Sequence, residues 1–179
     1  DTAQSHLERA VCLTPEAAQL HALLGLACKQ AGQVDAAEVA YRQAIALNPS
    51  DADAHYNLAI LYADQGCNED AIKHYRTAAR LEPDFADAHY NLGLALKAMG
   101  RFEDAVDAGQ RAVALSPGDA GAHNSLGNAL KDQGKQEEAV ASYHMALAIE
   151  TDFAEAHNNL GIALKDQDKQ GEAVASYHK

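Results

Sequence analysis

The sequence has no Trp, only four Pro and three Cys, and no long apolar segment. Cys12, Cys28 and Cys67 are odd in number and form no C-x-x-C pair, so they imply neither a disulfide framework nor a zinc site. This usage fits a reducing compartment, and we expect a cytoplasmic location. The longest apolar run, residues 22–28, is far shorter than the ~18 residues that a membrane-spanning helix requires, which argues against a transmembrane protein.

Basic residues are also scarce, since 14 Lys and Arg stand against 26 Asp and Glu for a net charge of −12. A nucleic-acid partner requires a Lys/Arg-rich surface that displaces counterions from phosphates, and an acidic field repels it. A neutral or basic protein partner is easier to accommodate. The first residue is Asp1 rather than Met, and no apolar signal segment follows it, so we expect a fragment of a longer protein.

Motifs of catalysis and cofactor binding are absent as well. The sequence contains no G-x-S-x-G nucleophile motif, no phosphate-binding glycine loop and no G-x-G-x-x-G after a predicted strand. The acidic residues are scattered over helix starts and outer faces, where capping and solubility explain them. We therefore expect this segment to be no enzyme and to bind no cofactor.

What the sequence does contain is a repeat with a period of 34 residues. Three series of residues share this interval: Pro15, Pro49, Pro83 and Pro117; Gly32, Gly66, Gly100 and Gly134; His21, His55, His89, His123 and His157. The next Pro would fall at Thr151, and the next Gly at Asp168. Agreement of independent series at one period predicts a chain built from repeated structural units.

Within each period the apolar pattern is helical twice. In the third full period, one helix face carries His89, Leu92, Gly93 and Leu96 at spacings of three and four residues. Gly100 then supplies the left-handed conformation that ends a helix. A second periodic run covers residues 102–113, and Pro117 stops it. Asp119 then caps the next helix. Each unit is predicted to be a helix, a tight turn, a second helix and a short loop.

These residues resemble the tetratricopeptide repeat (TPR) family. The family pattern W-x2-L-G-x2-Y…A-x3-F…P appears as His89-x2-Leu92-Gly93-x2-Leu96…Ala105…Pro117. Its downstream element is clearer in Ala37-x3-Tyr41, Ala71-x3-Tyr75, Ala139-x3-Tyr143 and Ala173-x3-Tyr177. The resemblance implies an all-α, right-handed superhelical solenoid whose first helices line an inner groove. Residues 1–179 then form one array: a half unit 1–17, full units 18–51, 52–85, 86–119 and 120–153, and a partial unit 154–179.

The histidine series does not predict a metal site. Successive copies would lie on helices about 8–10 Å apart, whereas a shared zinc ion requires each nitrogen at about 2 Å. The sequence has no H-E-x-x-H and places no carboxylate as a third ligand. We interpret the series as structural, at a position that the family usually fills with Trp or another bulky residue. His74, His144 and His178 fall on second helices, where we expect solvated side chains.

The residues that the resemblance places on the inner groove are the candidates for binding. The sixth positions of the units are Leu23, Asn57, Asn91, Ser125 and Asn159. The fifth positions are Ala22, Tyr56, Tyr90, Asn124 and Asn158, and Asn128 lies one turn further along its helix. Asn is a mediocre helix former, so its repetition needs a reason. Its amide both donates and accepts, and a series of such groups, the Asn ladder, can grip a peptide backbone.

The alternative is that the asparagines bond to neighbouring helices and fix the geometry between repeats. Tyr56 and Tyr90 would either add rigid contact area for the ligand or pack against the next repeat. Both interpretations stay open from the sequence.

Lysines recur near the ends of the first helices: Lys29, Lys97, Lys131 and Lys165. Lys97 and Lys131 are candidates for attracting an acidic ligand segment. Asp132 and Asp166 directly follow two of these lysines, so a solvated, locally neutralised helix edge is the alternative.

The pattern D/E-A-H-x-N-L-G at residues 87–93 and 155–161 is similar to repeats that precede the catalytic domain of O-linked N-acetylglucosamine transferases. In that family, inner-face asparagines contact the backbone of the protein substrate, which the resemblance extends to Asn57, Asn91 and Asn159. We predict a scaffold that binds a protein or an extended peptide segment in the concave groove. The alternatives are the substrate-recruiting arm of a glycosyltransferase and a self-assembling module that associates end to end.

Two positions depart from the repeat. Gly109 stands where other units carry Tyr41, Tyr75, Tyr143 and Tyr177. A mid-helix Gly costs about 1 kcal/mol relative to Ala. We expect the missing ring to leave a notch or a softer joint, and Gly109→Tyr to stabilise the fold. Asp168 replaces the turn glycine, where a left-handed Asp is tolerated at some cost.

Overall fold

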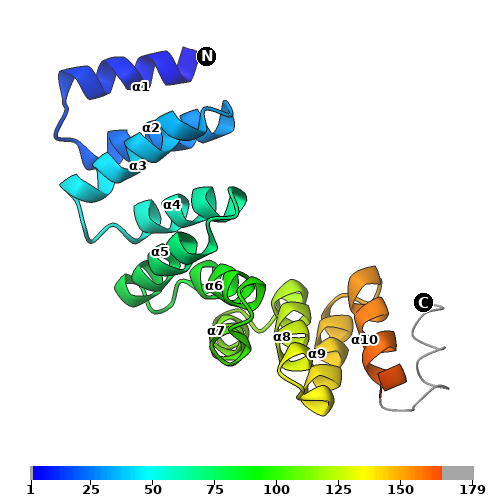
Figure 1. Ribbon diagram of the computed structural model, residues 1–179. Coiled ribbons are helices and arrows are strands. Elements are labelled where there is room, and N and C mark those ends of the chain that lie inside the picture. Colours follow the sequence, from blue (N-terminus) through cyan, green and yellow to red (C-terminus); the bar gives the residue numbers. More distant parts are fainter. Residues whose placement is uncertain (1, 167–179) are drawn as a thin grey trace. The chain divides into compact units, whose positions relative to one another are not determined.

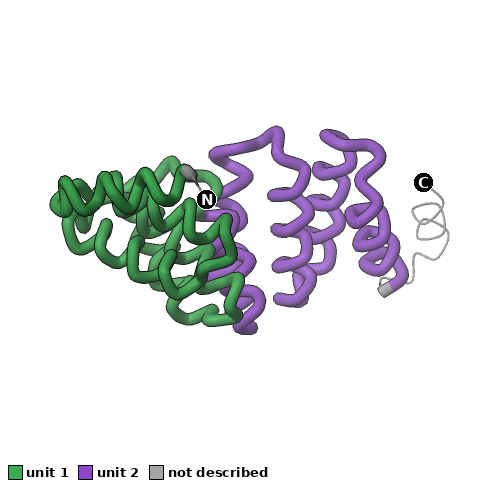
Figure 2. The backbone as a smooth tube through the Cα atoms, turned by 90° about the horizontal axis from the view of Figure 1, so that it is seen from above, with its two compact units in different colours: residues 1–88 green, residues 89–179 purple. Residues whose placement is uncertain are grey.

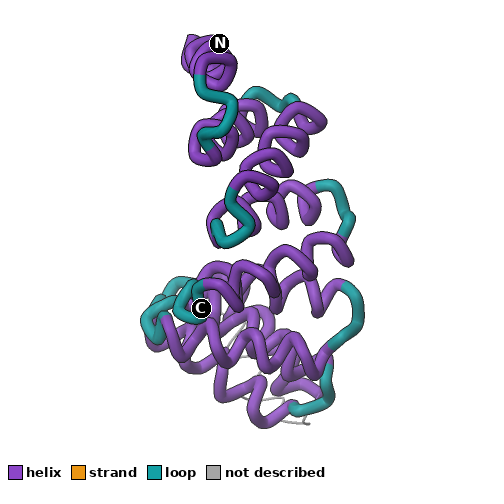
Figure 3. The backbone as a smooth tube through the Cα atoms, turned by 90° about the vertical axis from the view of Figure 1, so that its left-hand side faces the viewer, coloured by secondary structure: helices purple, strands orange, loops and turns teal. Residues whose placement is uncertain are grey.

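Short loops connect ten α-helices in the part of the chain that the computed structural model describes, residues 2–166 (Figure 1). The helices are α1 (Thr2–Leu13), α2 (Ala18–Gln30), α3 (Val34–Leu47), α4 (Ala52–Asp64), α5 (Asn68–Leu81), α6 (Ala86–Ala98), α7 (Phe102–Leu115), α8 (Ala120–Asp132), α9 (Gln136–Ile149) and α10 (Ala154–Asp166). Figure 3 shows only helices and loops among these residues. The predicted all-α repeat solenoid is confirmed.

The helices belong to two compact units, residues 1–88 and residues 89–179 (Figure 2). In the first unit, α2 packs against α3 and α4 packs against α5, while α2 and α4 also contact each other. In the second unit, α8 packs against α7 and α9, and α10 contacts both α8 and α9. First helices of successive repeats are therefore direct neighbours within each unit, and their side chains share one face.

A glycine in the left-handed conformation ends the first helix of each full repeat. The φ angles are 72°, 74°, 70° and 88° at Gly32, Gly66, Gly100 and Gly134. After Gly32, the backbone N–H of Gln33 donates to the Cys28 carbonyl at 2.9 Å, which is the Schellman pattern of a helix C-terminus. A residue with a side chain would be strained in this backbone conformation, which explains why glycine recurs at the turn of each repeat. Asp168 lies outside the described residues.

Buried histidines tie four of the loops to the helices that follow them. The bonds join Nε2 of His21, His55, His123 and His157 to the carbonyls of Pro15, Pro49, Pro117 and Thr151, at 2.9, 3.3, 3.2 and 2.9 Å. A carbonyl only accepts, so Nε2 carries the proton in each. Asp51 and Asp119 cap the same helices by accepting backbone N–H bonds of 2.9 and 3.1 Å. The structural role predicted for these histidines and the predicted cap at Asp119 are confirmed.

Tyrosine rings from second helices fill the space beside small residues of first helices. Tyr41, Tyr75 and Tyr143 are among the largest fully buried side chains. A Cβ atom added at Gly25 would lie 2.7 Å from the Tyr41 ring, and one at Gly127 would lie 2.5 Å from the Tyr143 ring. The missing side chain is thus what allows the ring to pack directly on the helix backbone.

Gly109 replaces this tyrosine in the third full repeat, and the predicted notch beside it is wrong. The cavity there is only about 10 Å³, at the lower limit for one water molecule. A Cβ at Gly109 would lie 3.2 Å from Cδ1 of Leu126, and one at Gly93 would lie 3.6 Å from the backbone nitrogen of Gly109. The backbones of α6 and α7 approach each other, and Leu126 covers the remainder, so no space for a ring is left.

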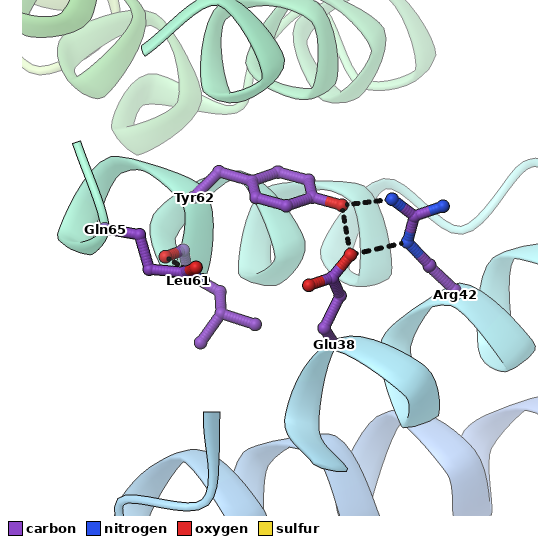
Figure 4. A network of polar contacts seen from close by, with 5 residues as sticks. All are labelled: Glu38, Arg42, Leu61, Tyr62 and Gln65. Atoms are coloured by element: carbon purple, nitrogen blue, oxygen red, sulfur yellow. Dashed lines mark hydrogen bonds and ion pairs between the residues drawn. The ribbon is translucent and has the colours of Figure 1, made fainter. Parts of the chain in front are cut away.

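A polar network joins α3 to α4 in the first unit (Figure 4). Glu38 Oε1 accepts hydrogen bonds from Arg42 Nε at 2.8 Å and from the Tyr62 hydroxyl at 2.9 Å. Arg42 Nη2 donates to the same hydroxyl at 2.8 Å. Bonds to charged groups are stronger than neutral ones, and Tyr62 is 6% exposed, so this contact stiffens the joint between two repeats.

His55 and His74 share a second buried contact of the first unit. Their Nδ1 atoms lie 2.9 Å apart. His55 holds its Nε2 proton for the Pro49 carbonyl, so in the neutral pair His74 donates from Nδ1 and His55 accepts. His74 is therefore half-buried and paired, which corrects the expectation that it is solvated. His144 is exposed as expected, and His178 lies outside the described residues.

Burial lowers the pKa of His74 to about 4, helped by His55, Lys73 and Arg42 and opposed by Asp70. Burial also lowers the pKa of His55. Because the ordinary value is about 6.5, the unfolded chain binds more protons than the folded chain below that pH. This pair therefore contributes stability that is lost as the pH falls from about 6.5 towards 4.

We predict that Gly109→Ala raises the free energy of unfolding by about 0.5–1 kcal/mol, because Ala is the better helix former and the flexible Leu126 methyl group can shift slightly. Gly109→Tyr is expected to lower it by about 1–3 kcal/mol through overpacking. Urea denaturation measures both variants. A Tyr variant more stable than the Ala variant would contradict the closed packing of α6 on α7.

We also predict that His74→Gln makes thermal stability less sensitive to acid, because the replacement keeps a hydrogen-bond donor but does not titrate in this range. The measurement is the melting temperature by circular dichroism at pH 7, 5.5 and 4.5. His144→Gln, which changes an exposed histidine, is the matched control and should keep the wild-type pH dependence. Parallel curves for wild type and His74→Gln would refute the role of the pair.

Candidate functional site

A groove of about 500 Å³ lies between α2 and α4 in the first unit. Its lining includes Leu23, Leu26, Asn48, Asp51, Asp53 and Asn57. The sixth positions of two successive repeats, Leu23 and Asn57, thus meet in one concavity. Asn57 is half-buried in its wall. Apolar and polar groups converge here as they do in sites that bind small molecules and peptides.

In the second unit, two of the candidate asparagines bond to their own fold. Asn124 Nδ2 donates to Glu155 Oε1 at 3.0 Å, and Asn159 Nδ2 donates to Asn124 Oδ1 at 3.0 Å. This chain connects α8 to α10. Asn124 is 3% exposed, and its amide is engaged in this bridge. The contacts of Asn124 and Asn159 are those of the alternative interpretation, in which the asparagines bond to neighbouring helices and fix the geometry between repeats.

Asn128 and Tyr90, two further candidates, also form hydrogen bonds within the second unit. Asn128 Oδ1 accepts a 2.8 Å hydrogen bond from the hydroxyl of the buried Tyr143. Ser125 Oγ donates to the Tyr90 hydroxyl at 3.4 Å, and both side chains are half-buried. The amide oxygen of Asn128 is thus occupied by the core tyrosine.

Tyr56 belongs to an aromatic cluster of the first unit. Its ring centroid lies 4.7 Å from that of Phe85 and 5.9 Å from that of Tyr75, with tilted planes. Aromatic pairs favour such tilted geometry. These contacts are the ones that the packing interpretation of Tyr56 predicts, and the ring is half-buried.

Two of the lysines form ion pairs from one repeat to the next. Lys29 lies 3.1 Å from Asp64, and Lys97 lies 3.8 Å from Asp132. Asp132 therefore pairs with Lys97 of the preceding repeat. Partly exposed pairs of this kind contribute about 0–1 kcal/mol, and they reduce the positive field that an acidic ligand would meet. The contacts of Lys97 are those expected of a locally neutralised helix edge.

The remaining candidates are accessible to different degrees. Asn158 is exposed, whereas Asn91 and Lys131 are half-buried. No three His, Cys, Asp or Glu side chains within residues 2–166 are grouped so as to hold a metal ion. None of the helices in that range combines the length and the apolar character needed to cross a bilayer.

Asn124→Ala is predicted to lower the free energy of unfolding by about 1–2 kcal/mol, because it leaves Glu155 and Asn159 without their shared partner. Asn158→Ala, at the same repeat position but exposed, is the matched control and should change stability by less than about 0.5 kcal/mol. Urea denaturation gives both values. Equal effects of the two substitutions would show that the bridge does not stabilise the fold.

Family comparisons agree with this geometry. The description "TPR repeat" matches residues 25–66, 61–100 and 127–168, and "tetratricopeptide repeat" matches residues 86–119. No curated protein matches the sequence. A crystal structure of MamA is 28% identical, with a TM-score of 0.84 over 87% of this chain and 91% of that chain.

Two other solved structures are similar. PilF of Pseudomonas aeruginosa is 25% identical, with a TM-score of 0.77 over 92% of this chain and 75% of that chain. YrrB, described as a TPR protein with an unusual peptide-binding site, is 22% identical, with a TM-score of 0.86 over 95% of this chain and 88% of that chain. At that identity the similarity to YrrB concerns the fold alone. The repeat matches extend over most of the sequence, and the chain belongs to the tetratricopeptide repeat family.

Proposed function

We propose that this chain is a protein-interaction scaffold that binds an extended peptide segment on the face formed by its first helices. TPR proteins bind protein or peptide partners, and the fold is of that kind. The observation that carries the proposal is the groove between α2 and α4, in which the amides of Asn48 and Asn57 accompany exposed apolar side chains.

The amides explain how such a groove would bind peptides of different sequence, because they bind the peptide backbone. A carboxamide has two donors and an acceptor, which match the N–H and C=O groups of an extended backbone. The Asn48 oxygen already accepts the Ser50 N–H at 3.3 Å, so Asn48 contributes its donors. Asn57 in the first unit and the exposed Asn158 in the second are the members best placed for this role. Asn91, Tyr90 and Lys131 remain secondary candidates, whereas Asn124 and Asn159 serve the joint between α8 and α10.

Recruitment rather than catalysis is the proposed role of this segment. Its acidic charge of −12 disfavours nucleic acid and favours neutral or basic protein partners. The cytoplasmic location stays a prediction.

Two other predictions from the sequence are separable by simple observations. An arm of an O-linked N-acetylglucosamine transferase-like enzyme requires that the gene continue into a nucleotide-sugar-binding α/β domain. End-to-end self-association requires a mass that rises with concentration in light scattering.

We predict that an Asn57→Ala/Asn158→Ala variant loses at least about tenfold in affinity for unstructured peptides, because each lost amide removes backbone hydrogen bonds. The measurement is binding to a diverse peptide library. The melting temperature should stay within about 2 °C of wild type, since both residues lie outside the core.

Asn159→Ala is the control, because it removes an amide of the α8–α10 bridge from the same repeat. It should lower stability while leaving peptide affinity within about twofold. Unchanged binding by the double variant, or an equal loss in the control, would refute a ligand role for the accessible amides.

A further inference from the structure

The groove between α2 and α4 has an apolar wall that the repeat pattern does not require. Leu23 occupies the sixth position, where later repeats carry Asn57, Asn91 and Asn159. Leu23 is 50% exposed, and Leu26, almost one turn further along α2, is 39% exposed. Both line the groove. A ligand side chain that covered them would remove apolar surface from water on both sides of the contact.

The opposite wall of the same groove is acidic. Asp51 and Asp53 line it, and no Lys or Arg is among the residues that line the groove. Lys29 of α2 is paired with Asp64 of α4 at 3.1 Å. Asp51 uses one carboxylate oxygen to cap α4 through the Ala54 N–H at 2.9 Å. Asp53 is exposed in the first turn of α4. Two carboxylates beside a concave surface of a chain with a net charge of −12 attract a cationic group.

We propose that this groove is a side-chain-specific subsite for a peptide segment that carries a bulky aliphatic residue next to Lys or Arg. Leu23 and Leu26 contact the aliphatic side chain, Asp53 pairs with the basic one, and Asn48 and Asn57 bind the backbone between them. The assignment rests on the proposed peptide-binding function and adds selectivity to it. The bound segment is thereby anchored at the α2–α4 groove and held elsewhere through its backbone.

The test uses the full chain, residues 1–179, and four fluorescein-labelled 12-residue peptides with the same Ser/Gln/Ala background. Their central pairs are Leu-Arg, Ser-Arg, Leu-Glu and Ser-Glu. Fluorescence anisotropy titrations should show that Leu-Arg binds about tenfold more tightly than either single replacement. The preference for Arg should weaken with added salt, because the charges are partly exposed.

Two variants test which wall of the groove causes the preference for Leu and which causes the preference for Arg. Leu23→Asn introduces the residue that the same helix position carries in later repeats, so the fold should hold, and the preference for Leu over Ser should disappear. Asp53→Lys should remove the preference for Arg over Glu. Glu69→Lys, an equal charge change on the second helix α5, is the matched control and should leave both preferences intact.

The outcomes separate the subsite from the scaffold function. If wild type binds all four peptides alike, or if Leu23→Asn keeps the preference for Leu, the subsite is overturned and the scaffold function stands. If none of the four peptides nor any member of the diverse peptide library binds, both are overturned. If Leu23→Asn instead abolishes a concentration-dependent increase in mass, the occupant of the groove is a second copy of this chain, which also overturns the proposal.

Discussion

The stacking of each helix pair on its neighbours is the constraint on which this structure depends. A single pair has two apolar stripes and can cover only part of them, so the rest must be covered by adjacent repeats. Small residues make the approach close enough. The ring of Tyr143 lies where a side chain at Gly127 would be. The loops are held by the buried histidines, which bond to carbonyls six residues earlier. Close packing and loop anchoring together place the first helices side by side within each unit.

The local features of the fold could be predicted from the sequence because they repeat. A left-handed turn at Gly32 and a cap at Asp119 depend on a few neighbouring residues. Because the same residues recur every 34 positions, the sequence pattern that predicts them is seen several times. The closed packing at Gly109 could not be predicted. It depends on how far α6 and α7 approach when a ring is missing and on how Leu126 fills the remainder. Such responses involve several helices and have no signature in the repeat pattern.

The site was predicted only in part, for a related reason. Sequence position indicates which residues share the first-helix face, and it identified Asn57 at the α2–α4 groove. It could not distinguish an available amide from a paired one, because the partner of Asn124, Glu155, lies 31 residues away. The Tyr62 network and the His55–His74 pair were missed for the same reason. A signal existed at Tyr62, which replaces a leucine of the later repeats.

We propose that the first helices carry two kinds of asparagine, one that is available to a peptide and one that holds neighbouring helices together. The most direct test is an NMR titration of the side-chain amide signals with an unstructured peptide mixture. We expect the signals of Asn57 and Asn158 to shift while those of Asn124 and Asn159 stay in place. Shifts confined to Asn124 and Asn159, or no shift at any of the four, would contradict it.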